Sequence, residues 1–542
     1  MPNFRGSRIP VPSDLNIPMW RELAADFSDQ RVIDFLEFGF PINHDGEREF
    51  STNRIKNHRG ALDFPEAVDM YISSELDQGT LAGPFRCNPL PVPLALSPVN
   101  TVPKSNQIDR RFIVDLKTSG VNEGIDKESY LGVPYQLHLP TVDAFVELIN
   151  ERGPGCLLFK RDLSWAYRQF PVDPGDWDKL GFVWRDELYI DRRLSMGLRS
   201  AVISCQGSGE VVGFIYKKCR GHPVVVYIDD FNGVSSSDPE VAQGDFQYLG
   251  ELLETLGLQE ATRKAVPPGT RRVLLGVMFD TVAMTIEVSP ERVADTLTLT
   301  DRWASQSRAT KQQVQQMVGK LIFICKCVRQ GRVFLNRLLS FLRGFSDEQK
   351  TRSIPWKAKL DVMWFNKYLK EYNGISIIPS QHWGAPDAVI ATDACLLGCG
   401  GTCSNQFFHS PFPQEVWERR YHISELEMLT VVAAIKLWSQ QCKGLNISIY
   451  CDNEATVIAI NSGRCRNEAM HACLRELAYV TVTHECQLRA THIRGKDNRI
   501  PDFLSRWELG QEFRQRFYRE TSGEVWREVR LPTEAFSFSH VW

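Results

Sequence analysis

The most constraining feature of the sequence is a short apolar run that ends in two adjacent carboxylates. Residues 224–228 are Val, Val, Val, Tyr and Ile, and Asp229 and Asp230 follow directly. This pattern predicts a buried strand, with residues 231–234 as the turn and return strand of a hairpin. Neighbouring anions at the end of an apolar strand repel each other and resist desolvation, and a bound divalent cation removes that cost. A solvated hairpin tip is the competing interpretation.

A second apolar run ends in the same way and favours the metal-binding interpretation. Residues 157–159 lead to Asp162, and neighbouring strands can bring Asp162 to Asp229 and Asp230. Three carboxylates at one strand end form a two-metal site for in-line phosphoryl transfer. Because successive strand residues point to opposite faces, the pattern favours Asp229 over Asp230 as the direct ligand.

Length and composition are those of a globular protein with several domains. The chain has 542 residues, of which 43% are hydrophobic and 24% are charged. No apolar run reaches the roughly 18 residues of a membrane span, and residues 1–6 lack a signal-peptide core. The cysteines form no CxxC pair, so we expect an intracellular protein, cytoplasmic or nuclear, in a reducing environment.

Local charge is more informative than the net charge of −3. Lys104 and Arg111 flank a polar turn before a strand, where they can grip a triphosphate or belong to a solvated basic hairpin. Residues 291–343 follow a helical period, and residues 302–371 carry fifteen Lys or Arg against four Asp or Glu. This excess predicts a track for a phosphate backbone rather than a solvated helical face.

The ordered motifs of the first half resemble the reverse transcriptases. Asp162 with Tyr167 five residues later is similar to their first palm motif, and residues 227–230 match Tyr-x-Asp-Asp. Residues 193–201 look like the intervening motif, in which Met196 stands where many members have Gln or Phe. Residues 207–209, Gly-Ser-Gly, then fall where a helix is expected.

That resemblance implies a right-hand polymerase and a role for each matched position. Asp162, Asp229 and Asp230 would bind two Mg²⁺ ions, with Mn²⁺ as an alternative. The residues implied to contact substrate are Lys104 and Arg111 at the triphosphate, Tyr167 against a 2′-hydroxyl, Met196 and Gly197 at the template and incoming nucleotide, and Lys264 in the segment that closes the palm.

The last third contains a second set of carboxylates. Asp393 ends a predicted strand, Glu427 lies in a predicted helix over 424–441, Asp452 follows the predicted strand 447–450, and Asp502 comes last. The last three have a structural alternative, because residues 424 and 427 fit a capping box, Asp452 fits an N-cap and Asp502 fits a helix-start charge.

The order of these four residues resembles ribonuclease H. The resemblance implies that they bind two Mg²⁺ ions and hydrolyse RNA in a hybrid, with His492 and Asn498 in the closing motif. His492 is implied to be catalytic and Asn498 to bind substrate. Glu427 fits the helix carboxylate better than Glu425, and Asp497 is a weaker last ligand than Asp502.

The two resemblances together imply an α/β and α+β multidomain chain with fingers, palm, thumb, connection and a ribonuclease H-like domain. Residues 1–85 show no chemistry and are expected to pack on the segment after residue 85. The expected segments are an N-terminal extension (1–85), fingers and palm (86–288), a helical thumb (289–345), a connection or linker (346–386), the ribonuclease H-like domain (387–507) and a C-terminal tail (508–542).

Three stretches narrow the resemblance to DIRS-type retrotransposons, which integrate through a tyrosine recombinase. These are Tyr-Ile-Asp-Asp-Phe at 227–231, residues 38–43 and residues 535–540. The absence of an Asp-Thr-Gly or Asp-Ser-Gly protease motif and of a His/Cys integrase module weakens the alternative of an LTR-retrotransposon fragment.

The expected function is RNA-directed and DNA-directed DNA polymerisation with hybrid-specific RNA cleavage. The expected partners are an RNA template, a DNA primer, RNA-DNA hybrid and dNTPs, with no membrane; an oligomer is compatible with this set. Two non-catalytic alternatives are a domesticated nucleic-acid-binding protein and a structural subunit paired with an active one. Intact predicted metal ligands argue against the domesticated binding protein.

Overall fold

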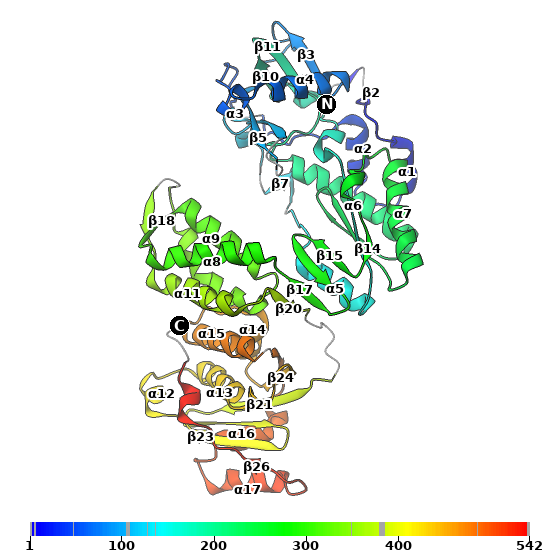
Figure 1. The fold of residues 1–542 in the computed structure, drawn as a ribbon. Coiled ribbons are helices and arrows are strands. Elements are labelled where there is room, and N and C mark those ends of the chain that lie inside the picture. Colours follow the sequence, from blue (N-terminus) through cyan, green and yellow to red (C-terminus); the bar gives the residue numbers. More distant parts are fainter. Residues whose placement is uncertain are drawn as a thin grey trace. The chain divides into compact units, whose positions relative to one another are not determined.

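The computed structural model describes residues 3–4, 7–46, 48–104, 109–126, 128–135, 137–347, 350–378, 385–484 and 486–538. The chain divides into two compact units (Figure 1). The first comprises Met1–Leu275 and Phe279–Ala283, and the second comprises Gly276–Met278 and Met284–Trp542. Over the described ranges, no helix is both long enough and apolar enough to cross a membrane.

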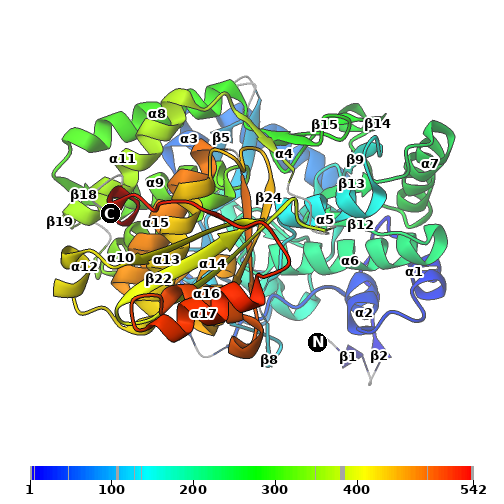
Figure 2. The ribbon, with the colours of Figure 1, turned by 90° about the horizontal axis from the view of Figure 1, so that it is seen from below.

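The first unit is organised around a four-stranded antiparallel sheet of order β12-β13-β9-β14. Its strands are β12 (Val224–Tyr227), β13 (Asp230–Val234), β9 (Leu158–Asp162) and β14 (Val266–Gly269). The predicted hairpin is confirmed, but its turn is Ile228 and Asp229, and residues 231–234 belong wholly to the return strand. Helix α6 (Ala201–Arg220) runs alongside these strands and contacts β12 (Figure 2).

The N-terminal residues share the core of the first unit. Trp20 and Ile33 are buried in one hydrophobic cluster with Val212 of α6, and the Trp20 indole donates a hydrogen bond to the Leu256 carbonyl at 2.8 Å. The expectation that residues 1–85 pack on later parts of the chain is therefore confirmed. Helices of this part are α1 (Ile17–Leu23), α2 (Arg31–Phe38), α3 (Arg59–Leu62) and α4 (Pro65–Asp77).

A second sheet and a hairpin complete the first unit. The sheet has the order β3-β11-β10-β4. Its strands are β3 (Leu81–Phe85), β4 (Leu96–Ser97), β10 (Gly181–Trp184) and β11 (Glu187–Asp191), and the hairpin is β5 (Val99–Pro103) with β6 (Arg110–Val114). Further elements are β1 (Asn3–Phe4), β2 (Ser7–Arg8), β7 (Ser129–Tyr130), β8 (Val133–Pro134), α5 (Val142–Arg152), α7 (Pro239–Thr255) and β15 (Arg271–Leu274).

The second unit contains helices over residues 291–343, as the period of these residues predicts. They are α8 (Pro290–Ser305), α9 (Lys311–Ile324) and α10 (Asn336–Arg343), and helix α11 (Trp356–Glu371) follows beyond that range. Val314, Met317 and Leu321 are buried on α9, whereas Ile322 is 45% exposed because it follows Leu321 by about 100° around the helix and leaves the apolar stripe.

The end of the predicted connection or linker (346–386) is partly strand. Strand β20 (Ile375–Ile377) pairs with β17 (Thr285–Glu287), so the chain leaves α11 through a sheet before it reaches the next part. Residues 379–384 of that linker lie outside the described residues. Strand β16 (Val277–Asp280) has residues in both units, and further strands of the second unit are β18 (Arg308–Thr310) and β19 (Thr351–Ser353).

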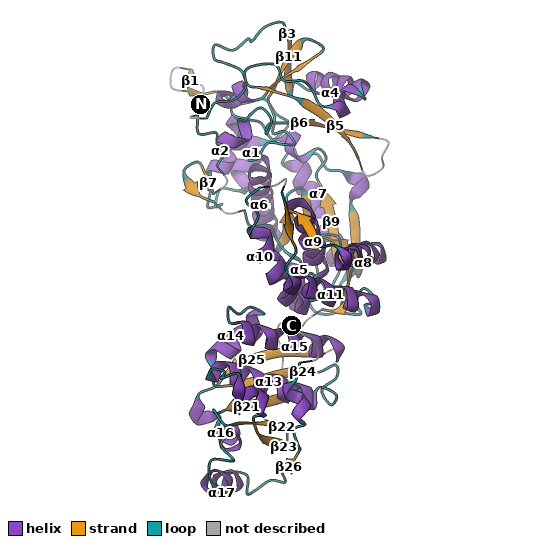
Figure 3. Cartoon of the chain, turned by 90° about the vertical axis from the view of Figure 1, so that its left-hand side faces the viewer, coloured by secondary structure: helices purple, strands orange, loops and turns teal. Residues whose placement is uncertain are grey.

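A six-stranded sheet of order β25-β24-β21-β22-β23-β26 forms the rest of the second unit (Figure 3). The strands are β21 (Ala388–Ala394), β22 (Gly398–Cys403), β23 (Gln406–Pro411), β24 (Asn446–Cys451), β25 (Gln487–His492) and β26 (Arg527–Glu528). The helices are α12 (Gln414–Glu418), α13 (Ile423–Trp438), α14 (Glu454–Ser462), α15 (Glu468–Thr483), α16 (Arg499–Ser505) and α17 (Gln511–Glu520).

The C-terminal residues expected as a tail complete this sheet. Strand β26 pairs in parallel with β23, and Phe517 of α17 packs with Phe407 and Trp507 in one hydrophobic cluster. The structural boundary therefore does not fall at residue 507. An edge strand of two residues carries too little pattern to be recognised from sequence.

A buried charge cluster joins the helices of the second unit to α15. Asp361 of α11 accepts hydrogen bonds from Arg475 and Arg337, and Arg475 also contacts His471. Burial raises the pKa of Asp361 to about 6, and the two arginines oppose that shift. Removing one member leaves the others as buried, uncompensated charges.

We expect Asp361→Ala to lower the free energy of unfolding of the second unit by about 3 kcal/mol, since breaking a buried charge pair typically costs 3–5 kcal/mol. Urea denaturation followed by circular dichroism measures the change. The exposed Asp295→Ala on α8 is the control, and equal effects of the two changes would mean that the buried cluster contributes no special stability.

Two candidate active sites

The first candidate site lies where β9 meets the β12–β13 hairpin. Asp230 stands directly opposite Asp162 in the register of β13 and β9, and Asp229 lies in the adjoining turn. Lys160 Nζ lies 2.7 Å from Asp230 Oδ1, and Lys264 Nζ lies 2.9 Å from Asp162 Oδ1. The structure therefore brings together the three carboxylates that the sequence singled out.

Burial makes ionisation of Asp229 and Asp230 costly. Asp162 is only 4% exposed. Burial, followed by the charge of Asp162, raises the pKa of Asp229. Burial, followed by contact with Asp162, raises the pKa of Asp230 to about 6. Carboxylate oxygens are the ligands that hard divalent cations prefer, so the site fits Mg²⁺ or Mn²⁺.

Helix α6 holds the turn that carries Asp229. Ile228 has a φ of 59°, a costly value for a β-branched residue, and its N–H donates to Gln206 Oε1 at 2.8 Å. Gln206 Nε2 also donates to the Val226 carbonyl at 3.2 Å. Sequence reasoning missed Gln206, because the contact of α6 with the hairpin appears only in the structure.

The Gly-Ser-Gly stretch after the middle motif lies inside the continuous helix α6. A Cβ on Gly209 would stand 2.6 Å from Val226 Cγ1, so the glycine permits the helix to approach β12 closely. The expected helix is confirmed, and the glycines do not break it because packing against the strand outweighs their weak helix propensity.

Tyr167 lies beside the carboxylates, on the one-turn 3₁₀ helix Ala166–Gln169. Burial, followed by the neighbouring charges of Cys205 and Asp229, raises its pKa to about 12. Gly197 has a φ of 109°, and a Cβ there would lie 2.4 Å from the Val114 carbonyl oxygen. Met196 is half-buried next to it. Only glycine fits at position 197.

The basic residues of the β5–β6 hairpin point in different directions. Lys104 Nζ lies 5.1 Å from the centre of the Trp165 ring, next to the segment that carries Tyr167. Arg111 is exposed on β6. Arg110 instead folds over Phe64 and donates to the Thr101 carbonyl at 2.7 Å. Of these three basic residues, Lys104 is the one that contacts the segment after Asp162.

We expect Tyr167→Ala to increase ribonucleotide incorporation by about tenfold or more, because a ring at this place would exclude a 2′-hydroxyl, and removing a steric contact of 1–3 kcal/mol changes selectivity by that factor. Primer extension with matched dNTP and rNTP measures it. The conservative Tyr167→Phe retains the ring and is expected to retain selectivity. A loss of stability with unchanged selectivity would place the sugar gate elsewhere.

The second candidate site lies at the edge of the six-stranded sheet. Asp393 is the penultimate residue of β21, Asp452 directly follows β24, and Glu427 reaches the same edge from α13. Ligand atoms of Glu427, Cys451 and Asp452 lie within 4.8 Å of one another. Burial raises the pKa of Asp393 to about 7, and the charges of Asp452 and Asp502 act in the same direction. The four carboxylates therefore share one site, and their oxygen donors fit Mg²⁺ or Mn²⁺.

The structural alternatives for these carboxylates are wrong for two of them. The capping box at the start of α13 is formed by His422 and Glu425, which leaves Glu427 to the site. The N-cap of α14 is Asn453, whose side chain accepts from the Thr456 N–H at 3.0 Å, so Asp452 makes no cap. Asp502 forms an ion pair with Arg506 at 2.7 Å.

The residues of the closing motif are divided between surface and interior. His492 is exposed, with Nε2 3.1 Å from the Asp452 carbonyl oxygen. Asn498 is 1% exposed and donates to the Thr392 carbonyl at 2.9 Å, so it fixes α16 against β21 and does not face a substrate. Cys451, with Sγ 3.8 Å from Glu427 Oε2, is a site neighbour that the sequence analysis passed over.

Comparison with known proteins finds a similar fold among solved structures. No protein-family model and no curated protein sequence matches the chain. Among solved structures, the chain is similar to the foamy viral protease-reverse transcriptase dRH in complex with double-stranded DNA. The sequence identity is 13% and the TM-score is 0.50. The match covers 91% of this chain and 84% of the other chain.

Two further foamy viral protease-reverse transcriptase structures are also similar. The complex with double-stranded DNA has 12% identity, covers 91% of this chain and 98% of the other, and has a TM-score of 0.48. The complex with RNA/DNA hybrid has 14% identity, covers 89% of this chain and 63% of the other, and has a TM-score of 0.46. The first match carries the conclusion that this chain has a mixed α/β, multidomain fold of the reverse transcriptase kind.

Proposed function

We propose that the chain is an RNA-directed and DNA-directed DNA polymerase with a fused ribonuclease H activity on RNA-DNA hybrids. The observation that carries the proposal is the placement of Asp162 directly opposite Asp230, with Asp229 in the adjoining turn, in a chain with a reverse-transcriptase-like fold. Two carboxylate-bearing strands held in register are what two-metal phosphoryl transfer requires.

In the polymerase site the three carboxylates would hold two Mg²⁺ ions. When bound, these ions would lower the pKa of a 3′-hydroxyl and neutralise the leaving pyrophosphate. Lys160 and Lys264 balance the carboxylates, and Lys104 and Arg111 would grip the triphosphate. Tyr167 would exclude the 2′-hydroxyl, and Met196 with Gly197 would support the template and incoming nucleotide.

In the nuclease site Asp393, Glu427, Asp452 and Asp502 would hold the second pair of ions. The exposed imidazole of His492, beside the Asp452 carbonyl, is placed to move a proton to or from a leaving group. Asn498 would position Asp502 indirectly, because its hydrogen bond to the Thr392 carbonyl fixes α16, which carries Asp502.

Primer extension on an RNA template by the purified chain tests the proposal. Template-dependent addition of dNTPs that requires Mg²⁺ is the expected result. The alternatives are a domesticated nucleic-acid-binding protein and a structural subunit; both would bind primer-template without extending it, in every divalent cation. Such a result would overturn the enzymatic proposal.

We further propose that the chain copies the RNA of a DIRS-type retrotransposon, with RNA template, DNA primer, hybrid and dNTPs as partners. Support comes from Tyr-Ile-Asp-Asp-Phe, which forms the candidate hairpin, and from the C-terminal stretch. Phe536 of that stretch packs 5.6 Å from Phe412, measured between ring centres, and His540 lies outside the described residues. Recovery of the coding sequence beside a tyrosine recombinase gene would support the assignment, and an adjacent integrase gene would contradict it.

The basic excess of residues 302–371 is partly neutralised by acidic neighbours. Lys320 pairs with Asp295, Lys370 Nζ lies 3.5 Å from Asp301, and Lys357 Nζ lies 2.6 Å from Glu468. Arg302, by contrast, is exposed at the end of α8. The phosphate-backbone track proposed for this region therefore has fewer available cations than the sequence count suggests.

We expect duplex affinity to fall with salt by about 0.9 log units per log unit of salt for each phosphate contact on B-DNA. Arg302→Gln should lower the slope by about one contact and weaken all sequences alike. Lys320→Gln, which removes an already paired cation, is the matched control. Fluorescence anisotropy across a salt series measures both slopes, and a salt-independent affinity would show that this surface does not bind phosphates.

A further inference from the structure

One thiol lies among the carboxylates of the proposed nuclease site. Cys451 is the last residue of β24 and is fully buried, and its Sγ lies 3.8 Å from Glu427 Oε2. Ligand atoms of Cys451, Glu427 and Asp452 all lie within 4.8 Å of one another. Two oxygens and one sulfur are therefore close enough for a single small ion to contact all three.

The spacing and chemistry of these donors suit a thiophilic ion. Zn²⁺ binds sulfur at about 2.3 Å and carboxylate oxygen at about 2.0–2.2 Å, so the ligands of one tetrahedral ion lie roughly 3.5 Å apart. The distance of 3.8 Å between Cys451 Sγ and Glu427 Oε2 is close to that value. Thiolate sulfur selects ions such as Zn²⁺, whereas carboxylate oxygens alone suit Mg²⁺ and Mn²⁺. Cys451 thus adds a preference that the carboxylates do not have.

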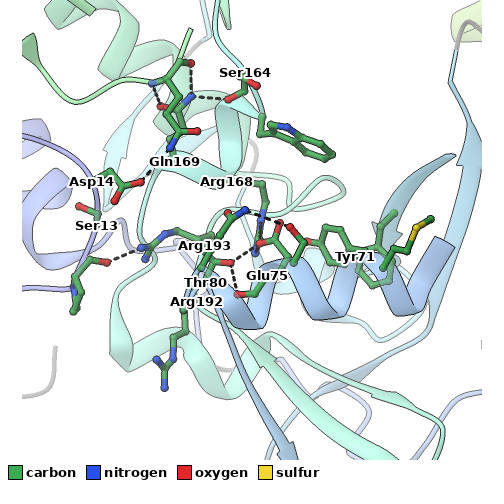
Figure 4. Close-up of a pocket in the computed structure, with 18 of the residues that line it drawn as sticks. Ser13, Asp14, Tyr71, Glu75, Thr80, Ser164, Arg168, Gln169, Arg192 and Arg193 are labelled. Atoms are coloured by element: carbon green, nitrogen blue, oxygen red, sulfur yellow. Dashed lines mark hydrogen bonds and ion pairs between the residues drawn. The ribbon is translucent and has the colours of Figure 1, made fainter. Parts of the chain in front are cut away.

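Glu427 differs from the other buried glutamates because it lacks a cation. Among the described residues, the buried glutamates are Glu75, Glu427 and Glu476. Glu75 accepts a hydrogen bond from Arg168 at 2.9 Å (Figure 4). Glu476 pairs with Lys436 at 2.5 Å. In the described part of the chain Glu427 forms no ion pair: one oxygen accepts a backbone N–H, and the other meets only a thiol, which is a weak donor. A buried anion in this state favours a bound cation.

The backbone around Cys451 favours a charged sulfur. The Asn453 N–H donates to Cys451 Sγ at 3.4 Å, and Asn453 is itself fixed as the N-cap of α14. A hydrogen bond to the charged form of a group stabilises that form. When an ion binds, a metal–sulfur bond replaces the S–H bond and the proton passes to the buffer. The cation then offsets the repulsion between the thiolate and the neighbouring carboxylates.

A second thiol near the same carboxylates provides a comparison. Cys399 of β22 is fully buried, and burial raises the pKa of its thiol, with the charges of Glu427 and Asp393 acting in the same direction. The group of ligand atoms formed by Glu427, Cys451 and Asp452 does not include it. Cys399 therefore shares the surroundings of Cys451 without its position among the ligands.

We infer that Glu427, Cys451 and Asp452 bind a thiophilic divalent cation of the Zn²⁺ class through sulfur as well as oxygen, and that this ion excludes the Mg²⁺ pair proposed for the same carboxylates. Because Glu427 and Asp452 cannot serve both kinds of ion at once, RNA cleavage stops while the thiophilic ion is bound. The binding needs no nuclease activity, whereas the inhibition rests on the proposed ribonuclease function.

Titrations of the full chain with Co²⁺ and Zn²⁺, in excess Mg²⁺ and without nucleic acid, test the binding. Cobalt–thiolate bonds give a charge-transfer absorption that carboxylates do not. We expect Cys451→Ser to lose part of this absorption and to weaken Zn²⁺ binding, measured against a chromophoric chelator, by about tenfold or more, since loss of even an outer-shell partner costs about 10–100-fold in metal affinity.

Two further variants make the binding result specific. Cys399→Ser is the matched control and should retain the absorption and the zinc affinity of the unmodified chain. Cys451→Ala removes the sulfur without adding a hydroxyl and should behave as Cys451→Ser does. Thermal unfolding followed by circular dichroism shows that each chain is folded. Equal zinc affinity in Cys451→Ser and Cys399→Ser would overturn the sulfur ligand.

Cleavage of a labelled hybrid in Mg²⁺ with increasing Zn²⁺ tests the exclusion, with each chain compared with its own rate in the absence of zinc. Half-inhibition of Cys451→Ser should need about tenfold or more Zn²⁺ than that of the unmodified chain or Cys399→Ser, in proportion to the lost affinity. Zinc that binds through Cys451 and leaves cleavage unchanged would overturn the exclusion of Mg²⁺. A chain that cleaves no hybrid but loses zinc affinity on Cys451→Ser would support the cation site and contradict only the proposed nuclease.

Discussion

Asp229→Asn is expected to reduce primer extension by about a thousandfold or more while primer-template binding stays within a few fold. Asp229 lies in the turn between β12 and β13, beside Asp162 and Asp230. Loss of a ligand in a two-metal site removes several kcal/mol of transition-state stabilisation, and each 1.36 kcal/mol is a factor of ten in rate. Single-turnover primer extension, with binding measured by anisotropy, separates the two effects.

The fold should tolerate this change. The Asp229 carbonyl accepts the Leu163 N–H at 3.0 Å, a backbone contact that asparagine retains. Asp162→Asn is expected to behave in the same way, because its partner Lys264 is largely exposed and can be solvated. Asp238→Asn, at the N-cap of α7, is a control outside the site. Extension near the unmodified rate in Asp229→Asn would remove this residue from the proposed metal site.

Asp452→Asn is expected to abolish hybrid cleavage and to leave extension within about twofold. Asp452 lies at the second site with Glu427 and Cys451, in the other compact unit from Asp229. Distant, independent sites respond separately to mutation. Since Asn453 caps α14, the change should not even incur the roughly 1 kcal/mol cost of a lost cap.

The cleavage of a labelled RNA strand in a preformed hybrid measures this effect. Asp497→Asn is the matched control, because Asp497 is a nearby exposed carboxylate outside the cluster of four. One duplex spanning both sites allows small effects on extension through positioning. Loss of extension in a folded Asp452→Asn chain would contradict two separate sites.

Strands that end in carboxylates were predictable because local pattern determines them. The apolar runs before Asp162, Asp229, Asp393 and Asp452 all form strands, as expected. The preference for Asp229 over Asp230 came from strand alternation, which does not apply because Asp229 lies in the turn and only Asp230 pairs with Asp162. Local pattern thus locates the site but does not show which carboxylate pairs with Asp162 across the strands.

Features that depend on contacts distant in sequence were not predictable. Gln206 supports the Ile228 turn only because α6 packs against β12, and Arg193 meets Pro12 across 181 residues. The edge strand β26 follows β23 by more than a hundred residues and spans only two. A single sequence provides the periodicity of each element but not the partner that it meets.

One doubly labelled reaction tests the central claim that the chain carries two active sites of different chemistry. An RNA template and a DNA primer bear separate labels, and the unmodified chain, Asp230→Asn and Asp452→Asn are followed together in Mg²⁺. We expect the unmodified chain to lengthen the DNA and shorten the RNA, Asp230→Asn only to shorten the RNA of a preformed hybrid, and Asp452→Asn only to lengthen the DNA. Loss of both activities in either folded variant, or neither activity in the unmodified chain, would contradict the claim.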